Sequence, residues 1–327
     1  MRVVATKFYQ PEDISYLQKE LPNFDFWFPQ QAEDLDNLMD VVEGVNVFLG
    51  PPPPSYVIEA VSNTLKLVQI PWSGVDGIDF SACHKYAIPC ANTHTNAVSV
   101  AELAVSLCLD VLKATPFHDA EFRKGHWHRP GSPEGFFPPR LLSGQSVGIL
   151  GFGSIGREIH RILKGFNLDV AALSYSGRKH TDIRMFDRQT QLSEFLARSD
   201  VLFLAAPLTS ETHNILNDTS LSHMRETSVL VNVSRAELID LKALHRSLTE
   251  KKISGAALDV HWRNLSTVEQ KLAKDIHNMQ NVVMSPHRGG FTAGDLPHLK
   301  GAVENIRKLA EGRLDEIIGR IDFDKGY

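Results

Sequence analysis

Residues 146–156 have the sequence SVGILGFGSIG, and this stretch decides the fold of the central part of the chain. The apolar strand pattern SVGIL runs into G-x-G-x-x-G, and the helical pattern REIHRILKGF follows. Gly151 permits a tight turn, Gly153 lets the backbone approach a pyrophosphate, and Gly156 lets helix and strand pack closely. A glycine turn without a ligand is the alternative. We predict a dinucleotide-binding loop that contacts its cofactor through Gly151, Gly153, Ser154, Ile155 and Gly156.

Alternating strand and helix patterns extend in both directions from this motif. Apolar runs continue toward the C-terminus as DVAALSY, DVLFLAAP, SVLVNVS, ISGAALDV and NVVMSPH, with helical patterns between them. The N-terminal part repeats the rhythm with RVVAT, DFWF, VNVFLG and KLVQIPW. This pattern predicts an α/β protein with two doubly wound parallel sheets, the central one of Rossmann type. Helical periodicity over residues 99–113 predicts a helix that links the two lobes.

The length of 327 residues exceeds what one ordinary hydrophobic core supports, so we expect two domains. Residues 1–96 and 291–327 form a discontinuous first domain, because the helical pattern of residues 296–314 is expected to return to it. Residues 97–290 form the dinucleotide-binding domain. We expect the active site in the cleft between the two domains.

The net charge of −5 provides no basic field for a polyanion, so nucleic-acid binding is not expected. No apolar run reaches membrane-spanning length, and the N-terminal MRVVATKFYQ lacks a signal-peptide pattern. We therefore expect a cytoplasmic protein that does not bind membranes.

The three cysteines, Cys83, Cys90 and Cys108, are an odd number without metal-ligand spacing. A bridge between Cys83 and Cys90 is one alternative, and small apolar side chains in a reducing compartment are the interpretation that we favour. His126 and His128 flank Trp127, but no nearby cysteine or carboxylate completes a ligand set. We expect no metal.

The second strand of a dinucleotide fold normally ends in an acidic residue that holds the ribose hydroxyls. Here the strand ends at Ser174, and no acidic residue occurs before Asp182, while Arg178 and Lys179 lie between them. A guanidinium can bind a 2′-phosphate in a fork, and no carboxylate repels it. NADP is therefore favoured over NAD, with ordinary surface Arg and Lys as the alternative.

Several blocks of sequence carry a resemblance to a known family. TNAVSVAELAVSLCL, GHW, PLTSETHNIL, VLVNVSRAELID, GAALDV and VMSPHRGGFT occur in the family's order. Across nearly its whole length the chain resembles the D-isomer-specific 2-hydroxyacid dehydrogenases, which include glyoxylate/hydroxypyruvate reductases and phosphoglycerate dehydrogenases. The resemblance implies a flavodoxin-like substrate domain, hydride transfer between a nicotinamide and a small 2-hydroxy or 2-keto acid, and a homodimer.

The same resemblance implies the roles of individual residues. Arg235 would bind the substrate carboxylate and polarise the 2-oxygen, and His287 would be the acid/base. Backbone N–H groups of Ser73, Gly74 and Val75 would also meet the carboxylate; a simple turn is the alternative. Further cofactor contacts would come from Pro207, Thr209, Val233, Ser234, Asp259 and Gly289, although Asp259 could cap a helix instead.

One position departs from the family pattern. The family has a Glu five residues after the Asp of GAALDV, where it hydrogen-bonds the catalytic His, and this chain has Asn264. An amide can orient His287 but supplies no negative charge, so we expect an activity optimum shifted toward acid. Glu269 could fold back in its place. The substitution keeps two alternatives open: a formate-type dehydrogenase, and a dehydrogenase-like protein that senses dinucleotides with little or no turnover.

Overall fold

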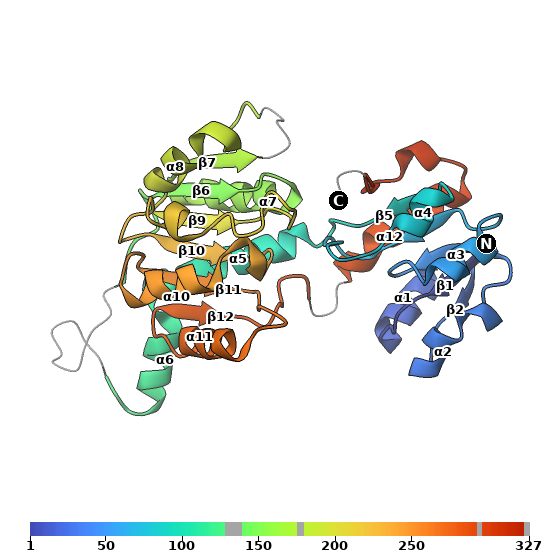
Figure 1. Cartoon of the computed structure of the whole chain (residues 1–327), viewed down its shortest axis with the longest axis horizontal. Coiled ribbons are helices and arrows are strands. Elements are labelled where there is room, and N and C mark those ends of the chain that lie inside the picture. The colour runs from blue at the N-terminus through green and yellow to red at the C-terminus, as the bar shows by residue number, and fades with distance from the viewer. Residues whose placement is uncertain (128–138, 175–179, 293–295, 324–327) are drawn as a thin grey trace. The chain divides into compact units, whose positions relative to one another are not determined.

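A computed structural model describes residues 1–127, 139–174, 180–292 and 296–323 of the chain (Figure 1). The chain divides into two compact units. The first consists of Met1–Asn96 and Gly290–Tyr327, and the second of Ala97–Gly289. Each unit is a parallel sheet covered by helices, so the predicted fold class is confirmed.

The first unit contains a five-stranded parallel sheet with the order β2-β1-β3-β4-β5, the flavodoxin-like arrangement. Its strands are β1 (Arg2–Ala5), β2 (Asp25–Trp27), β3 (Val45–Leu49), β4 (Leu67–Gln69) and β5 (Cys90–Ala91). Its helices are α1 (Pro11–Glu20), α2 (Ala32–Asp36), α3 (Ser55–Val61), α4 (Ser81–Lys85) and α12 (Pro297–Ala310), with short 3₁₀ turns at Leu38–Asp40 and Leu314–Glu316. Apolar residues pack on both faces of this sheet.

Helix α12 belongs to the first unit. Its buried residues pack with α1 on one face of the sheet (Figure 1). A polar contact also fixes the helix, because Asn305 Nδ2 donates to Gln69 Oε1 at 2.9 Å and both side chains are fully buried. Asn305 also bonds the backbone of Ile318 through both its oxygen and its nitrogen. The C-terminal segment is thereby tied to strand β4 of the sheet.

The second unit contains a seven-stranded parallel sheet with the order β12-β11-β10-β9-β6-β7-β8. Its strands are β6 (Ser146–Leu150), β7 (Asp169–Ser174), β8 (Arg184–Asp187), β9 (Val201–Leu204), β10 (Val229–Asn232), β11 (Gly255–Leu258) and β12 (Val282–Met284). Its helices are α5 (Ala97–Lys113), α6 (Thr115–Arg123), α7 (Ser154–Leu163), α8 (Arg188–Arg198), α9 (Asp218–Leu221), α10 (Leu241–Thr249) and α11 (Thr267–His277), with 3₁₀ turns at Lys164–Phe166 and Ala236–Leu238.

Helices cover both faces of this sheet, as Figure 1 shows for α7 and α10. Buried residues of α5 and α7 share one core with β6 and β9, and those of α10 and α11 share the other. Strands β9–β11 are buried throughout and β6 is buried from Val147 on, which explains why their sequences are continuous apolar runs rather than alternating ones.

Strands β5 and β8 and helix α6 are among the elements that were not anticipated from the sequence. Strand β8 is short and half polar, strand β5 has two residues, and helix α6 has no fully buried residue. None of these segments carries the apolar periodicity on which the other assignments rest.

Two further predictions concern the cysteines and the absence of membrane-spanning helices. Cys83, Cys90 and Cys108 are all buried free thiols, in agreement with the apolar interpretation and not with a bridge. Among the described helices, none has the length and apolar character needed to cross a bilayer.

Candidate active site

The glycine-rich loop joins β6 to α7 at the carboxyl edge of the second sheet. Gly151 has a φ of +95°, and a Cβ there would lie 2.5 Å from the Ala206 nitrogen. A Cβ on Gly156 would lie 2.2 Å from the Gly151 oxygen, so helix and strand approach as closely as glycine allows. A Cβ on Gly153, by contrast, would meet no described atom within 4 Å.

The beginning of helix α7 is open to a ligand. Gly153 is its N-cap, and no side-chain hydrogen bond caps the helix. The first backbone N–H groups of a helix have no partner within it, so those of Ser154 and Ile155 are available to an anion. The donors, the open space at Gly153 and the dipole of the helix together fit a dinucleotide pyrophosphate.

Strands β10, β11 and β12 are neighbours in that order, and a predicted site residue follows each of them. Arg235 comes after β10, Asp259 after β11 and His287 after β12. All three therefore lie at one carboxyl edge, with β10 and β12 about 10 Å apart by ordinary strand spacing. The glycine loop follows β6 at the same edge, where parallel α/β sheets bind ligands.

A buried amide shapes the turn that presents Arg235. Asn232, at the end of β10, is 0% exposed. Its Oδ1 accepts from Ser234 N at 2.9 Å, and its Nδ2 donates to the Arg235 carbonyl at 2.8 Å. The hydroxyl of Ser234 donates to the Ala206 carbonyl. Asn232 was not predicted as a residue that shapes the site. The available signal was a polar residue at the end of the apolar run VLVN.

His287 lies in a turn with a left-handed backbone, at a φ of +57°. Its Nδ1 is 3.2 Å from the Asp259 carbonyl oxygen. A carbonyl can only accept, so this contact places the proton of the neutral imidazole on Nδ1. The Nε2 atom then remains as the basic nitrogen of the exposed ring.

Asp259 organises the same turn with its carboxylate. The side chain is 2% exposed and accepts from Arg288 N at 2.8 Å and from Gly289 N at 2.9 Å. The Ser99 hydroxyl donates to the Gly289 carbonyl at 2.6 Å and fixes the far side of the turn. The helix-cap alternative for Asp259 is wrong, because Ser266 is the N-cap of α11.

Asn264 and Glu269 are the two candidate partners of His287. Asn264 is exposed, with a φ of +55°, and among the described residues no hydrogen bond joins it to His287. Glu269 accepts from the backbone N–H and the hydroxyl of Ser266 in the capping box of α11. The suggestion that Glu269 folds back in place of the family Glu is therefore wrong.

The loop of Ser73, Gly74 and Val75 lies in the first unit, after β4. Asn92 Nδ2 donates to the Ser73 carbonyl at 2.6 Å, and the Ser73 hydroxyl donates to Asn96 Oδ1 at 2.9 Å. Within the described part of the chain, none of the three backbone N–H groups of this loop donates a hydrogen bond. Such consecutive open donors form a concavity that suits an anion.

The remaining predicted cofactor residues surround the same edge of the second sheet. Thr209 N donates at 2.7 Å to the hydroxyl of Thr212, which itself donates to the Pro207 carbonyl at 2.7 Å. Thr212 is fully buried, and this structural role was missed in the sequence. Val233 is buried beside the turn that presents Arg235, and Ser174 ends β7. Arg178 and Lys179 lie outside the described residues.

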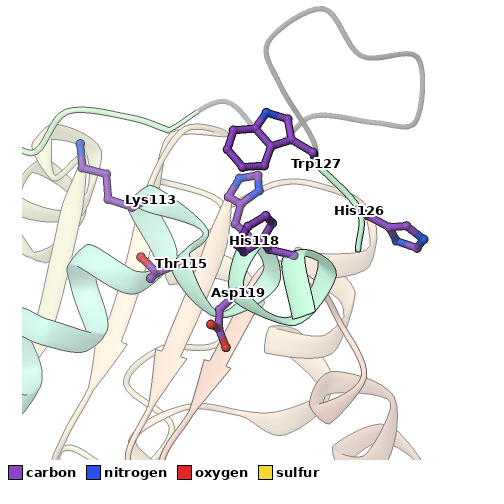
Figure 2. A pocket seen from close by; sticks show the side chains of 7 residues that line it. Lys113, Thr115, His118, Asp119, His126 and Trp127 are labelled. Atoms are coloured by element: carbon purple, nitrogen blue, oxygen red, sulfur yellow. The ribbon is translucent and has the colours of Figure 1, made fainter. Parts of the chain in front are cut away.

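Two cavities lined by described residues of the second unit lie away from Arg235 and His287. The larger, of about 500 Å³, lies at α6 and is lined by Lys113, Thr115, His118, Asp119, Phe122, His126 and Trp127 (Figure 2). The smaller, of about 260 Å³, lies beside the glycine loop and is lined by Phe152, Arg157, Glu158, His160, Arg161, Lys164, His180 and Asp182.

The titration of His160 reflects its place in the smaller cavity. Burial lowers its pKa, and the nearby Lys164 lowers it further, while Asp182 opposes both. No group of three or more potential metal-ligating side chains occurs among the described residues.

The chain is similar to known proteins of one enzyme family. The family model "D-isomer specific 2-hydroxyacid dehydrogenase, NAD binding domain" matches residues 105–289. Glyoxylate reductase of Pyrococcus furiosus is 30% identical over 299 residues, which cover 89% of this chain and 86% of that protein. Glyoxylate/hydroxypyruvate reductase HPR3 of Arabidopsis thaliana is 35% identical over 243 residues, covering 73% of this chain and 72% of that protein.

A solved structure shows the same fold over the whole chain. It is the NADPH-dependent glyoxylate/hydroxypyruvate reductase of Sinorhizobium meliloti in complex with NADP and malonate, with a TM-score of 0.77 and 24% identity. The alignment covers 98% of this chain and 96% of that one. The chain therefore belongs to the D-isomer-specific 2-hydroxyacid dehydrogenase family and is an NAD(P)-dependent oxidoreductase.

Proposed function

We propose that the protein reduces a small 2-oxo acid to the D-2-hydroxy acid, with Arg235 and His287 as its catalytic residues. The observation that carries the proposal is the placement of these residues on either side of Asp259, at the sheet edge that also bears the open glycine loop. In this proposal Met1–Asn96 with Gly290–Tyr327 is the substrate domain, and Ala97–Gly289 holds the dinucleotide.

Arg235 is proposed to bind the substrate carboxylate and to polarise the 2-oxygen. Its guanidinium is permanently charged and planar, so it matches a carboxylate with two parallel N–H donors. Backbone N–H groups of residues 73–75 are proposed to donate to the same carboxylate. Their open state supports this role, because buried or half-buried donors are normally satisfied.

His287 is proposed to move the proton. During reduction the imidazolium gives the Nε2 proton to the 2-oxygen, while the other proton stays on Nδ1, which donates it in a hydrogen bond to the Asp259 carbonyl oxygen. During oxidation the neutral ring accepts the hydroxyl proton at Nε2. Asp259 acts as a positioning residue through the N–H groups of the turn.

The glycine loop and the first turn of α7 fit a dinucleotide, and their contacts are proposed to extend to Pro207, Thr209, Val233, Ser234, Asp259 and Gly289. When bound, the nicotinamide supplies the hydride that reaches C2 of the substrate. An orienting role of Asn264 toward His287, without added charge, is also proposed, although no hydrogen bond joins the two side chains among the described residues.

We infer that the cofactor is NADP rather than NAD. The absence of an acidic residue between Ser174 and Asp182, together with Arg178 and Lys179, supports this preference. The cavity beside Phe152 supplies a second argument, because basic side chains, among them Arg157 and Lys164, outnumber the two carboxylates in its lining. A 2′-phosphate is the part of NADP that such groups would attract.

A homodimer and a cytoplasmic location complete the proposal. Phe122 and Trp127 at α6 are 58% and 63% exposed and pack edge to face, with ring centroids 5.2 Å apart. An exposed aromatic pair over a cavity is typical of a contact surface, and Figure 2 shows Trp127 beside this cavity. Three free thiols suit a reducing compartment.

A panel of 2-oxo acids, assayed once with NADPH and once with NADH, tests the function. We expect reduction of at least one short 2-oxo acid and a higher kcat/KM with NADPH. Cofactor binding without turnover of any member would favour a dinucleotide-sensing protein, and oxidation of formate would favour the formate-type alternative. Sedimentation velocity of the wild type and of Trp127→Ser tests the homodimer.

A further inference from the structure

Lys7 holds a positive charge at the carboxyl edge of the first sheet. It lies two residues after the end of β1, and its ammonium nitrogen lies 5.0 Å from the ring centroids of both Tyr9 and Trp72. The aliphatic stem packs against the backbone of Gly50, where a Cβ would lie 3.4 Å from Lys7 Cγ. The side chain is half-buried, so its position is set by packing rather than by solvent.

No anion neutralises this ammonium within the described residues, where Lys7 forms neither an ion pair nor a hydrogen bond. Asp13 is the nearby carboxylate, but both of its oxygens are engaged. One accepts from Gln10 N at 3.1 Å in the capping box of α1, and the other lies 3.5 Å from His298 Nε2.

The environment makes an unpaired charge costly. Burial lowers the pKa of Lys7, and the field of Asp13 opposes that effect only in part. Two aromatic faces attract a cation, but more weakly than a hydrogen-bonded anion does. A ligand anion placed on the open side of Lys7 would supply the missing partner.

Trp72 connects Lys7 to residues 73–75, the loop that is proposed to bind the substrate carboxylate. Trp72, whose ring contacts Lys7, immediately precedes Ser73. The Thr93 N–H donates to the Trp72 carbonyl at 3.3 Å, and Asn92 holds the Ser73 carbonyl at 2.6 Å. The indole and the open N–H groups of residues 73–75 are thus fixed on one rigid turn, next to one another.

We propose that Lys7 is a specificity-determining residue that binds a second anionic group of the substrate, a carboxylate at the far end of a short 2-oxo acid. The inference rests on the proposed function, in which the first carboxylate meets residues 73–75. Lys7 then selects 2-oxo dicarboxylic acids over monocarboxylic acids of equal length.

The test compares 2-oxoglutarate with 2-oxopentanoate, which have the same chain length and differ in the terminal carboxylate. Wild-type protein, Lys7→Met, Lys7→Gln and Lys7→Arg are assayed with NADPH and NADH, and each variant is checked for cooperative thermal unfolding. Lys19→Met is the matched control, because Lys19 is an exposed lysine of α1. Isothermal titration calorimetry measures binding of both acids to the same proteins.

The wild type is expected to prefer 2-oxoglutarate. Loss of the charge in Lys7→Met and Lys7→Gln should reduce the ratio of the two kcat/KM values about 10- to 100-fold, chiefly through KM. Lys7→Arg should restore much of that ratio, and Lys19→Met should leave it unchanged. An equal loss on both acids, or a wild type without preference, would overturn the proposal.

Calorimetry separates the failure of this inference from the failure of the proposed function. If the wild type reduces neither of these acids nor any other member of the 2-oxo acid panel, the proposed function is wrong. Tighter binding of 2-oxoglutarate that depends on Lys7 would still support the anion subsite, and equal binding of both acids by wild type and Lys7→Met would refute it.

Discussion

The backbone carbonyl oxygen of Asp259 lies 3.2 Å from Nδ1 of His287, and the carboxylate of the same aspartate holds the chain just beyond that histidine. One residue therefore controls both the proton on the imidazole and the left-handed turn that carries it. Because the carboxylate is almost fully buried, its two N–H contacts are charge-assisted bonds shielded from water.

Replacement of Asp259 by Asn should impair both the turn and the reaction. The amide retains one acceptor, but its NH₂ group faces a backbone donor, so a contact worth about 1.5–3 kcal/mol is lost. We expect a kcat at least tenfold lower and a lower thermal unfolding midpoint. Asp218→Asn, which alters an exposed pair with Arg246, is the control and should change neither quantity appreciably. Wild-type kcat in Asp259→Asn would contradict this account.

His287→Asn should remove the proton donor while leaving the dinucleotide site intact. General acid catalysis by a positioned histidine contributes about 10²- to 10⁴-fold, so kcat should fall by that factor. The dissociation constant of NADPH, measured by fluorescence, should remain close to that of the wild type. A fall in NADPH affinity that matches the fall in rate would assign His287 to cofactor binding instead.

Arg235→Lys should show whether the planar fork matters in addition to the charge. A lysine keeps the positive charge but offers no pair of parallel donors, so kcat/KM for the 2-oxo acid should fall more than tenfold. Steady-state kinetics measure the effect, and Arg225→Lys, at an exposed pair with Asp200, is the control. Equal kcat/KM in Arg235→Lys and wild type would show that a point charge suffices.

Much of the fold could be predicted because its determinants are local. The glycine motif between SVGIL and REIHRILKGF specifies β6, its turn and α7, and the apolar runs specify β7 and β9–β12. Strand β8 was not predicted because RMFD lacks an apolar run. Its strand conformation depends on pairing with β7 rather than on its own sequence.

The candidate site was predictable in its residues but not in its contacts. Arg235 and His287 follow apolar strands, and that position alone places them at the ligand-binding edge. The hydrogen bonds of Asp259 with Arg288 and Gly289 join segments that lie far apart in sequence, so no local pattern predicts them. The S-x-x-E pattern of residues 266–269 predicts the capping role of Glu269 from sequence alone, although Glu269 was also a candidate partner of His287.

Gly153→Ala should separate cofactor binding from folding. A Cβ at Gly153 meets no described atom within 4 Å, so the folded unit should tolerate it. The same Cβ would occupy the space that a pyrophosphate needs, and we expect the dissociation constant of NADPH to rise at least tenfold with little change in thermal stability. Fluorescence titration and thermal unfolding measure the two quantities.

Two other glycines provide the controls for that prediction. Gly165→Ala also meets open space and should alter neither property. Gly151→Ala should prevent folding of the second unit, because the residue has a positive φ and its Cβ would strike the Ala206 backbone. Unchanged NADPH affinity in a folded Gly153→Ala protein would show that the loop does not hold the phosphates.

Asn264→Glu should move the pH dependence of reduction. Reduction requires the protonated form of His287, and a carboxylate beside the ring would favour that form, so the alkaline limb of the rate profile should shift to higher pH. Residue 264 has a left-handed backbone that suits Asn better than Glu, so a stability loss of about 1 kcal/mol should accompany the shift. Asn264→Gln reproduces the strain without the charge and should keep the wild-type profile. Coincident profiles for Asn264→Glu and Asn264→Gln would show that residue 264 does not act on His287, which would leave the Asp259 carbonyl as the partner that sets its proton.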